Sequence, residues 1–317
     1  PAASHLRGPG GACVRCVRLA YSPRLNVPVV SRKSSFRPST MQPPAVRRAA
    51  CAGRTMQAEL LLFDIGNTSI KVGLADASRV CTSYTLRTDT GQTSDSLGLS
   101  LLTLLSHAGV SAEGITHCVI SSVVPNINAT VRACVARYIG CPVAFVPADI
   151  PVPLENHYDI PTEVGADRLV GAYAARRLHP DPTSFIVVDF GTAVTFDCVE
   201  GNAYRGGLIF PGPQTALSAL ARQTAQLPRV DLELDATEPV IARSTSTSIQ
   251  HGLYFGFVGM VESLCARLAR QLPGETAIYA TGGFAQGMAR VTSIFTEVFP
   301  SLLLEGLRRL HFESIGR

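Results

Sequence analysis

Features that would mark a membrane, metal-binding or disordered protein are scarce in this 317-residue sequence. No uninterrupted apolar run approaches the roughly 18–20 residues that a spanning helix needs, so we expect no membrane segment. The nine cysteines and seven histidines form no repeated pair at the spacing of a zinc site, which excludes structural zinc. Charged residues make up only 16% and hydrophobic residues 46%, a composition that excludes a disordered chain and fits one large or two ordinary domains.

Acidic residues are absent from the first 57 positions, which carry nine arginines and one lysine. Residues 58–317 then hold 18 basic and 24 acidic residues, a net charge of −6, so we expect no nucleic-acid partner for them. We predict that residues 1–57 are a basic, disordered leader, with a mis-assigned start, a transit peptide and a functional segment as open explanations. The odd number of cysteines, mostly in apolar segments, is typical of reduced thiols and predicts a cytoplasmic protein.

Two segments about 125 residues apart share one pattern. Each has a short apolar run, then an aspartate (Asp64 or Asp189), a glycine turn and a stretch of alternating apolar residues, which predicts a β-hairpin. The repetition predicts duplicated domains, and strands that alternate with helices predict the α/β class. The helices that we expect cover residues 95–108, 127–139, 166–178 and 214–223.

An Asp-x-Gly turn at the end of a strand suits phosphate chemistry. The carboxylate can hold Mg²⁺, and the glycine lets backbone N–H groups approach phosphate oxygens without a Cβ in the way. In the first turn, Asn67 or Thr68 can donate a further hydrogen bond. A third glycine-rich segment, Thr281-Gly282-Gly283, follows a short predicted strand over 277–280. Together the three segments indicate a nucleotide-phosphate site.

These segments resemble the phosphate-1, phosphate-2 and adenosine segments of the actin/Hsp70/sugar-kinase ATPase superfamily. Over about residues 59–310, the order of the motifs is similar to that of type III pantothenate kinases. The motifs are Asp64-Ile65-Gly66-Asn67-Thr68, Ser122-Val123-Val124-Pro125, Gly165-Ala166-Asp167-Arg168, Asp189-Phe190-Gly191-Thr192-Ala193, Gly206-Gly207, Pro211-Gly212, Thr224-Ala225-Gln226-Leu227-Pro228, Thr281-Gly282-Gly283 and Leu304-Glu305-Gly306-Leu307.

The resemblance implies a fold and a function. It implies two ribonuclease H-like (actin-like ATPase) domains, at residues 58–178 and 179–317, with a cleft between them. It implies ATP-dependent phosphorylation of pantothenate to 4′-phosphopantothenate, the first step of coenzyme A biosynthesis, with Mg²⁺ and a monovalent cation, K⁺ or NH₄⁺. It also implies a homodimer whose pantothenate pocket lies at the subunit interface.

Roles follow from the resemblance residue by residue. The expected ATP-phosphate segment consists of Asp64, Ile65, Gly66, Asn67, Thr68, Ser69, Ile70 and Lys71, with Asp64 as the Mg²⁺ ligand through the phosphates, and Thr192 is a further ATP contact. Asp167 is expected to be the catalytic base. The expected pantothenate contacts are Tyr158, Gly165, Ala166, Asp167, Arg168 and Thr245, and the expected monovalent-cation ligand is Asp189.

The residues alone leave other interpretations open. Asp167 could be an early-helix acid that the helix dipole favours, Arg168 a surface arginine and Tyr158 a packed loop aromatic. Asp197 matches a recurring strand acid that can be structural or catalytic. Ile160 and residues 242–244 depart from the family pattern, which bears on pantothenate contacts more than on phosphate contacts.

Two rival functions also stay open. One is a kinase of the same superfamily that acts on a sugar or a carboxylate. The other is a non-enzymatic regulator, since the family includes accessory factors named for a role in virulence-gene transcription. The presence of Asp64, Asp167 and Asp189 together favours catalysis, because a binding module has no need for all three.

Overall fold

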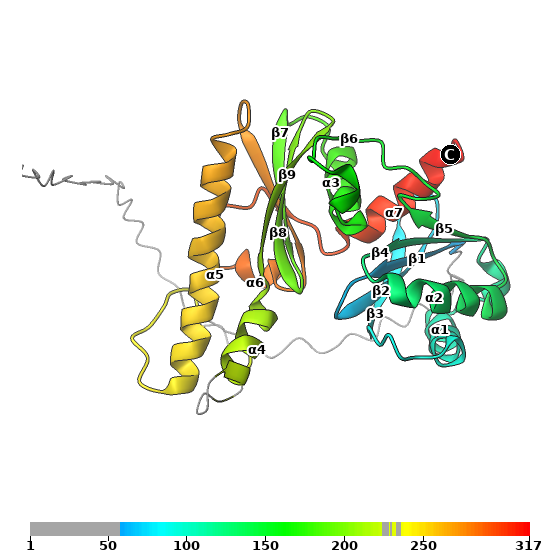
Figure 1. Cartoon of the computed structure of the whole chain (residues 1–317), viewed down its shortest axis with the longest axis horizontal. Coiled ribbons are helices and arrows are strands. Elements are labelled where there is room, and N and C mark those ends of the chain that lie inside the picture. The colour runs from blue at the N-terminus through cyan, green and yellow to red at the C-terminus, as the bar shows by residue number, and fades with distance from the viewer. Residues whose placement is uncertain (1–57, 224–227, 229, 233–235) are drawn as a thin grey trace, which may run out of the picture. The chain divides into compact units, whose positions relative to one another are not determined.

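The computed structural model describes residues 58–317, except 224–227, 229 and 233–235. The predicted leader and residues 224–227 of one family motif therefore lie outside the described residues. The described part of the chain contains two β-sheets and the helices that pack on them (Figure 1).

The first sheet has the strand order β3-β2-β1-β4-β5. Its strands are β1 (Leu60–Ile65), β2 (Ser69–Ala75), β3 (Val80–Arg87), β4 (His117–Ser122) and β5 (Val143–Val146). The β1–β2 and β2–β3 pairs are antiparallel, whereas the β1–β4 and β4–β5 pairs are parallel. Helices α1 (Ser94–Ala108) and α2 (Pro125–Tyr138) bury their apolar side chains in one cluster with this sheet. A 3-10 turn, η1 (Ala112–Gly114), precedes β4.

The second sheet has the strand order β11-β10-β7-β8-β9-β6. Its strands are β6 (Glu155–Asn156), β7 (Ser184–Phe190), β8 (Ala193–Glu200), β9 (Ala203–Pro211), β10 (Thr276–Gly282) and β11 (Glu297–Val298). Five of them repeat the first sheet in order and direction, because β7–β8 and β8–β9 are antiparallel while β7–β10 and β10–β11 are parallel. The α/β class and the duplication are therefore confirmed.

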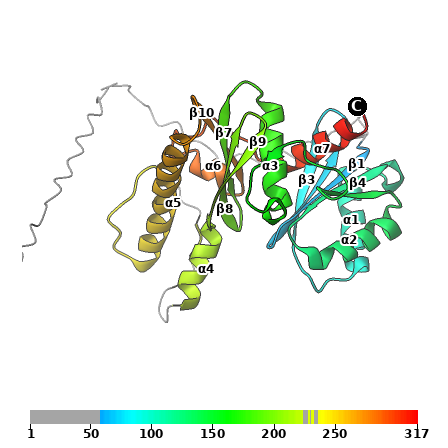
Figure 2. The ribbon, with the colours of Figure 1, turned by 45° about the horizontal axis from the view of Figure 1, so that its top comes forward.

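Helices α3 (Ala166–Leu178) and α7 (Leu302–Ser314) lie between the two sheets (Figures 1 and 2). One apolar cluster joins Leu62 of β1, Tyr173 of α3, Val187 of β7 and Leu307 of α7. The two helices approach closely at Gly306, where an added Cβ would lie 2.8 Å from Val170 Cγ1. The last helix of the chain therefore packs against the first sheet, and the expected boundary at residues 178/179 and the expected cleft stay predictions.

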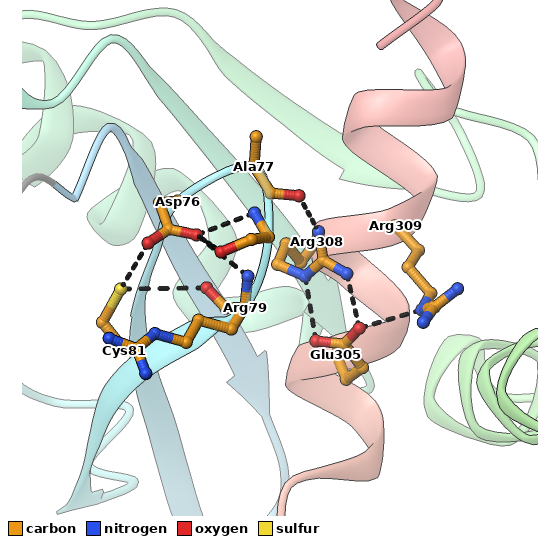
Figure 3. A network of polar contacts seen from close by, with 8 residues as sticks. Asp76, Ala77, Arg79, Cys81, Glu305, Arg308 and Arg309 are labelled. Atoms are coloured by element: carbon orange, nitrogen blue, oxygen red, sulfur yellow. Dashed lines mark hydrogen bonds and ion pairs between the residues drawn. The ribbon is translucent and has the colours of Figure 1, made fainter.

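A buried arginine anchors α7 to the turn that follows β2 (Figure 3). Arg308 donates through Nε to Glu305 Oε2 (2.9 Å), through Nη2 to Glu305 Oε1 (2.5 Å) and through Nη1 to the carbonyl of Ala77. In the same turn, hydrogen bonds from Ser78, above all from its hydroxyl, lower the pKa of Asp76 to about 2. The hydrogen bond from Arg308 to the Ala77 carbonyl thus ties the C-terminal helix to the first sheet, while Glu305 of the same helix holds the guanidinium in place.

The remaining helices flank the second sheet. They are η2 (Pro161–Glu163), α4 (Pro213–Gln223), α5 (Thr245–Ala269) and α6 (Ala285–Met288). Helix α5 contributes Tyr254, Phe257, Val261 and Cys265 to the core of this sheet. By length and composition it is the one helix of the described residues that could span a membrane, a test that the core helices of soluble proteins also pass.

Candidate active site

The two predicted phosphate turns are each closed by a hydrogen bond from the N–H of their glycine, and they lie against each other. In the first, Gly66 N–H donates to the carbonyl of Ser69 (3.0 Å), and in the second Gly191 N–H donates to the carbonyl of Ala193 (3.0 Å). The hydroxyl oxygens of Thr68 and Thr192 lie 2.9 Å apart in one hydrogen bond. The duplicated hairpins therefore bring their turns together, as a shared phosphate site requires.

The third glycine-rich segment packs against the second turn. An added Cβ at Gly282 would lie 2.4 Å from Asp189 Oδ1 and 2.6 Å from Phe190 N, and the φ of this residue is +92°. Gly212 also has no room for a side chain, since its Cβ would lie 2.2 Å from the carbonyl of Gly191. Glycines are therefore needed here so that the backbone at Gly282 can approach Asp189 and the backbone at Gly212 can approach the second turn.

Three carboxylates and one lysine share this region. Burial raises the pKa of Asp64 to about 6, with Lys71 opposing and the charge of Asp167 adding to the rise. Burial likewise raises the pKa of Asp189 to about 7, opposed by Lys71 and reinforced by Asp64 and then Asp167. Lys71 Nζ lies 3.5 Å from Asp64 Oδ2. The carboxylates outnumber the cation, so this region favours added positive charge.

Carboxylate oxygens at this place fit a hard cation such as Mg²⁺. Among the described residues, however, no three His, Cys, Asp or Glu side chains form a group that could hold a metal ion. A cation here would therefore take ligands from outside the chain as well, and the phosphates of ATP are such ligands.

Asp167 lies in the first turn of α3, two residues after the N-cap Gly165. Its Oδ1 accepts a hydrogen bond from the backbone N–H of Arg168 (2.8 Å), and an added Cβ at Gly165 would lie 2.5 Å from the same oxygen. Burial raises the pKa of Asp167, while the backbone N–H and the charge of Arg168 lower it. The Gly-Ala-Asp-Arg motif thus places one carboxylate at a helix N-terminus beside Asp64 and Lys71.

Arg168 is buried, so its interpretation as a surface arginine is wrong. Its Nε donates to Asp197 Oδ1 (2.7 Å), and the hydroxyl of Tyr204 donates to the same oxygen (2.8 Å). The ring centroid of Tyr158 lies 6.5 Å from that of Tyr204. Arg168 and Tyr158, which are ten residues apart in the sequence, therefore belong to one group of side chains.

The structure does not bring every predicted residue into this group. Thr245 is exposed at the first position of α5, and in the described part of the chain no hydrogen bond joins it to another predicted site residue. Ile70 is fully buried in the core of the first sheet, so it can offer only its backbone to a ligand. Asn67 and Thr68 are exposed at the turn.

Asp197 and Tyr204 belong to this group but were not among the predicted site residues. Asp197 is 2% exposed and bound to Arg168, a contact between residues 29 positions apart. In the sequence, Asp197 is recognisable as an acid among the apolar residues of a strand. A buried acid at such a position needs a buried partner.

Two sheets of one topology with paired Asp-x-Gly turns define the actin-like ATPase class of α/β proteins. A family model described as type III pantothenate kinase matches residues 60–267. The chain therefore belongs to the type III pantothenate kinase family.

Two relatives agree with this assignment, and a solved structure agrees with the fold. A type III pantothenate kinase of Desulfovibrio desulfuricans is 65% identical over 259 residues, which cover 82% of this chain and 98% of the relative. Another, of Nitratidesulfovibrio vulgaris, is 55% identical over 262 residues, 83% of this chain and all of the relative. A crystal structure from Campylobacter jejuni, of a protein named for the Baf family of transcriptional activators, superposes with a TM-score of 0.52 at 17% identity. It covers 81% of this chain and 100% of its own, and it supports the fold alone.

Proposed function

We propose that this chain transfers the γ-phosphoryl group of ATP to the 4′-hydroxyl of pantothenate, the first step of coenzyme A biosynthesis. The observation that carries the proposal is the placement of Asp167, at the N-terminus of α3, close enough to Asp64 and Lys71 for their charges to interact. Relatives named type III pantothenate kinase, one of them 65% identical, support pantothenate as the acceptor.

Asp167 acts as the catalytic base in this proposal. It accepts the proton of the 4′-hydroxyl as the oxygen attacks the γ-phosphorus, and it holds that oxygen in place. Burial raises its pKa, which strengthens it as a base. Since phosphoryl transfer depends mainly on positioning and on charge stabilisation, a fixed carboxylate is a sufficient contribution from the protein at this atom.

The paired turns hold the phosphates of ATP. The exposed turn residues Asn67 and Thr68 and the hydroxyl of Thr192 are the donors, and Lys71 supplies a positive charge beside Asp64. Asp64 would hold Mg²⁺ through the phosphates, and Asp189 would hold K⁺ or NH₄⁺. When bound, these cations offset the charge of the phosphates and of the buried carboxylates.

The acceptor site consists of Gly165, Ala166, Arg168 and Tyr158, with Thr245 as a further contact. Gly165, Ala166 and Arg168 adjoin Asp167 in the sequence, and Tyr158 lies in the group of side chains around Arg168. Thr245 stands apart from them in one chain, which fits a pocket that is completed in a dimer.

A homodimer is supported by an exposed apolar run on β9. Leu208, Ile209 and Phe210 are 38%, 65% and 40% exposed. Among the described residues, the outer edge of β9 is paired only at Ala203 and Tyr204, with β6. A second copy that covers the rest of this strand would bury the apolar run, and closed two-fold dimers are the commonest way to do so.

The state of the cysteines supports a cytoplasmic location. The six described cysteines are free thiols, and five of them are buried. Free buried thiols are typical of a reducing compartment, where ATP is also available.

The test is ADP release by the full chain with ATP, Mg²⁺ and K⁺, supplied in turn with pantothenate, glucose, N-acetylglucosamine or acetate. We expect turnover that depends on pantothenate, and mass spectrometry should find 4′-phosphopantothenate. Turnover with a sugar or with acetate alone would assign the chain to a different kinase activity. A folded chain that is inactive with all four would favour a regulator.

A further inference from the structure

Arg168 holds a buried donor that has no partner among the described residues. Its side chain is 7% exposed, and Nε is bound to Asp197. Nη2 is enclosed and makes no hydrogen bond in the part of the chain that the structure describes. Buried N–H groups are nearly always paired, so an unpaired one in a candidate active site points to a ligand.

The surroundings of Nη2 place it at the acceptor site. The Cβ position of Gly207 lies 3.1 Å from Nη2, and that of Gly206 lies 3.4 Å from Tyr158 Cδ2. Burial lowers the pKa of Arg168, whereas the charges of Asp197 and Tyr204, the hydrogen bond with Asp197 and, least, a polar side-chain contact with Tyr158 raise it above its ordinary value. That contact with Tyr158 is too loose to be a hydrogen bond to Nη2 by geometry. The unpaired donor therefore lies beside the glycine pair of β9 and close to Tyr158.

Asp197 fixes the orientation of this donor. Its Oδ1 accepts from Arg168 Nε (2.7 Å) and from the Tyr204 hydroxyl (2.8 Å), and its Oδ2 accepts from Thr195 Oγ1 (3.0 Å). Asp197 pairs with Gly207 in the β8–β9 ladder. Strand β8 therefore cannot shift without moving β9 and its two glycines. Burial raises the pKa of Asp197, and the charge of Arg168 and the hydrogen bonds from Tyr204, Thr195 and Arg168 oppose this rise. A carboxyl group with three donors is held in one position.

We propose that Asp197 is a positioning residue for the acceptor, which holds Arg168 so that Nη2 donates to an oxygen of pantothenate. The assignment rests on the proposed function, because it takes pantothenate as the acceptor. Asp197 itself touches neither substrate, and it acts through Arg168. Its pairing with Arg168 and the unpaired Nη2 are both accounted for by this role.

The test is the Asp197→Asn variant, measured for kcat and for the KM of each substrate. We expect the KM for pantothenate to rise roughly 10- to 100-fold, as for other partners that orient a ligand-binding side chain, while the KM for ATP stays within about two-fold. Glu305→Gln is the matched control, since Glu305 also holds a buried arginine, Arg308, by two hydrogen bonds. It should lower the melting temperature without changing the KM for pantothenate.

Asp197→Asn can fail to fold, so Tyr204→Phe is measured beside it. This variant removes one hydrogen bond to Asp197 Oδ1 and leaves the ion pair with Arg168 in place. We expect the KM for pantothenate to rise several-fold. An unchanged KM in folded Tyr204→Phe and in folded Asp197→Asn would overturn the assignment.

A double-mutant cycle separates action through Arg168 from a direct or purely structural role. If Asp197 acts through Arg168, adding Asp197→Asn to Arg168→Ala should leave kcat/KM for pantothenate unchanged. Losses that multiply would contradict the assignment while leaving the proposed function intact. A wild-type chain that neither binds nor phosphorylates pantothenate would overturn both.

Discussion

The substitution Gly282→Ala tests whether the backbone must approach Asp189 as closely as the structure has it. The new Cβ would lie 2.4 Å from Asp189 Oδ1 and 2.6 Å from both N and O of Phe190, and the φ of +92° disfavours any L side chain. The backbone conformation costs about 1–2 kcal/mol and the overpacking about 1–3 kcal/mol. We therefore expect a loss of roughly 2–5 kcal/mol, a large part of the stability of an ordinary domain.

The matched control is Gly274→Ala. Gly274 has a φ of +69°, and no atom lies within 4 Å of its Cβ position, so alanine there carries only the conformational cost. Urea unfolding followed by circular dichroism measures both variants. A free-energy loss at position 282 no larger than that at position 274 would refute the close approach of the third glycine segment to Asp189.

Two further predictions concern charge and assembly. The folded chain holds the proton of Asp189 more tightly than the unfolded chain, since the pKa is about 7 against an ordinary 3.8, so this group makes stability fall as pH rises between those values. Asp189→Asn should therefore raise the melting temperature at pH 8 in buffer without K⁺ or Mg²⁺, by an amount worth about 1–3 kcal/mol. The same variant should have no turnover. Equal melting temperatures of the variant and the wild type would contradict the burial of this charge. Ile209→Glu should convert a dimer into a monomer, as measured by light scattering. The control Leu99→Glu changes a side chain of similar exposure (61% against 65%) and should leave the dimer intact. A dimer that survives Ile209→Glu would place the interface elsewhere.

Local patterns predicted much of the fold. The helix expected over residues 166–178 is α3 (Ala166–Leu178), and those expected over 95–108, 127–139 and 214–223 lie within two residues of α1, α2 and α4. These segments have apolar periodicity, and the two hairpins have strong turn residues. The repeat of Asp64 at Asp189 predicted the duplication because both copies keep the same turn chemistry.

Other elements have weaker or misleading local signals. Strand β9 carries Gly206 and Gly207, which lower strand propensity, so the sequence predicted a glycine motif there but no strand. Helix α5 was not predicted, because glycines at 252, 256 and 259 interrupt its apolar pattern. The packing of α7 on the first sheet joins segments more than 200 residues apart, as in the contact of Arg308 with Ala77, and no local pattern encodes it.

The residues of the candidate site also fall into those that local patterns predict and those that they do not. Glycine turns and the Gly-Ala-Asp-Arg motif are contiguous, so their residues could be named from the sequence. The pairing of Arg168 with Asp197 is a contact between a helix and a distant strand, so the sequence left Arg168 open as a surface residue and Asp197 without a role. Thr245 was named by resemblance alone, and its part in the site stays a prediction.

The most direct test of the central claim, that Asp167 is the base for phosphorylation of pantothenate, is the turnover number of Asp167→Asn beside that of Asp95→Asn. Asp95 is an exposed acid in the first turn of α1, and it pairs with Arg137 of α2. It therefore matches Asp167 in its place on a helix but not in its surroundings. We predict that Asp167→Asn lowers kcat with pantothenate by roughly 10²- to 10⁴-fold, with ATP binding retained, and that Asp95→Asn leaves kcat unchanged. A folded Asp167→Asn variant that keeps the wild-type kcat would contradict the account.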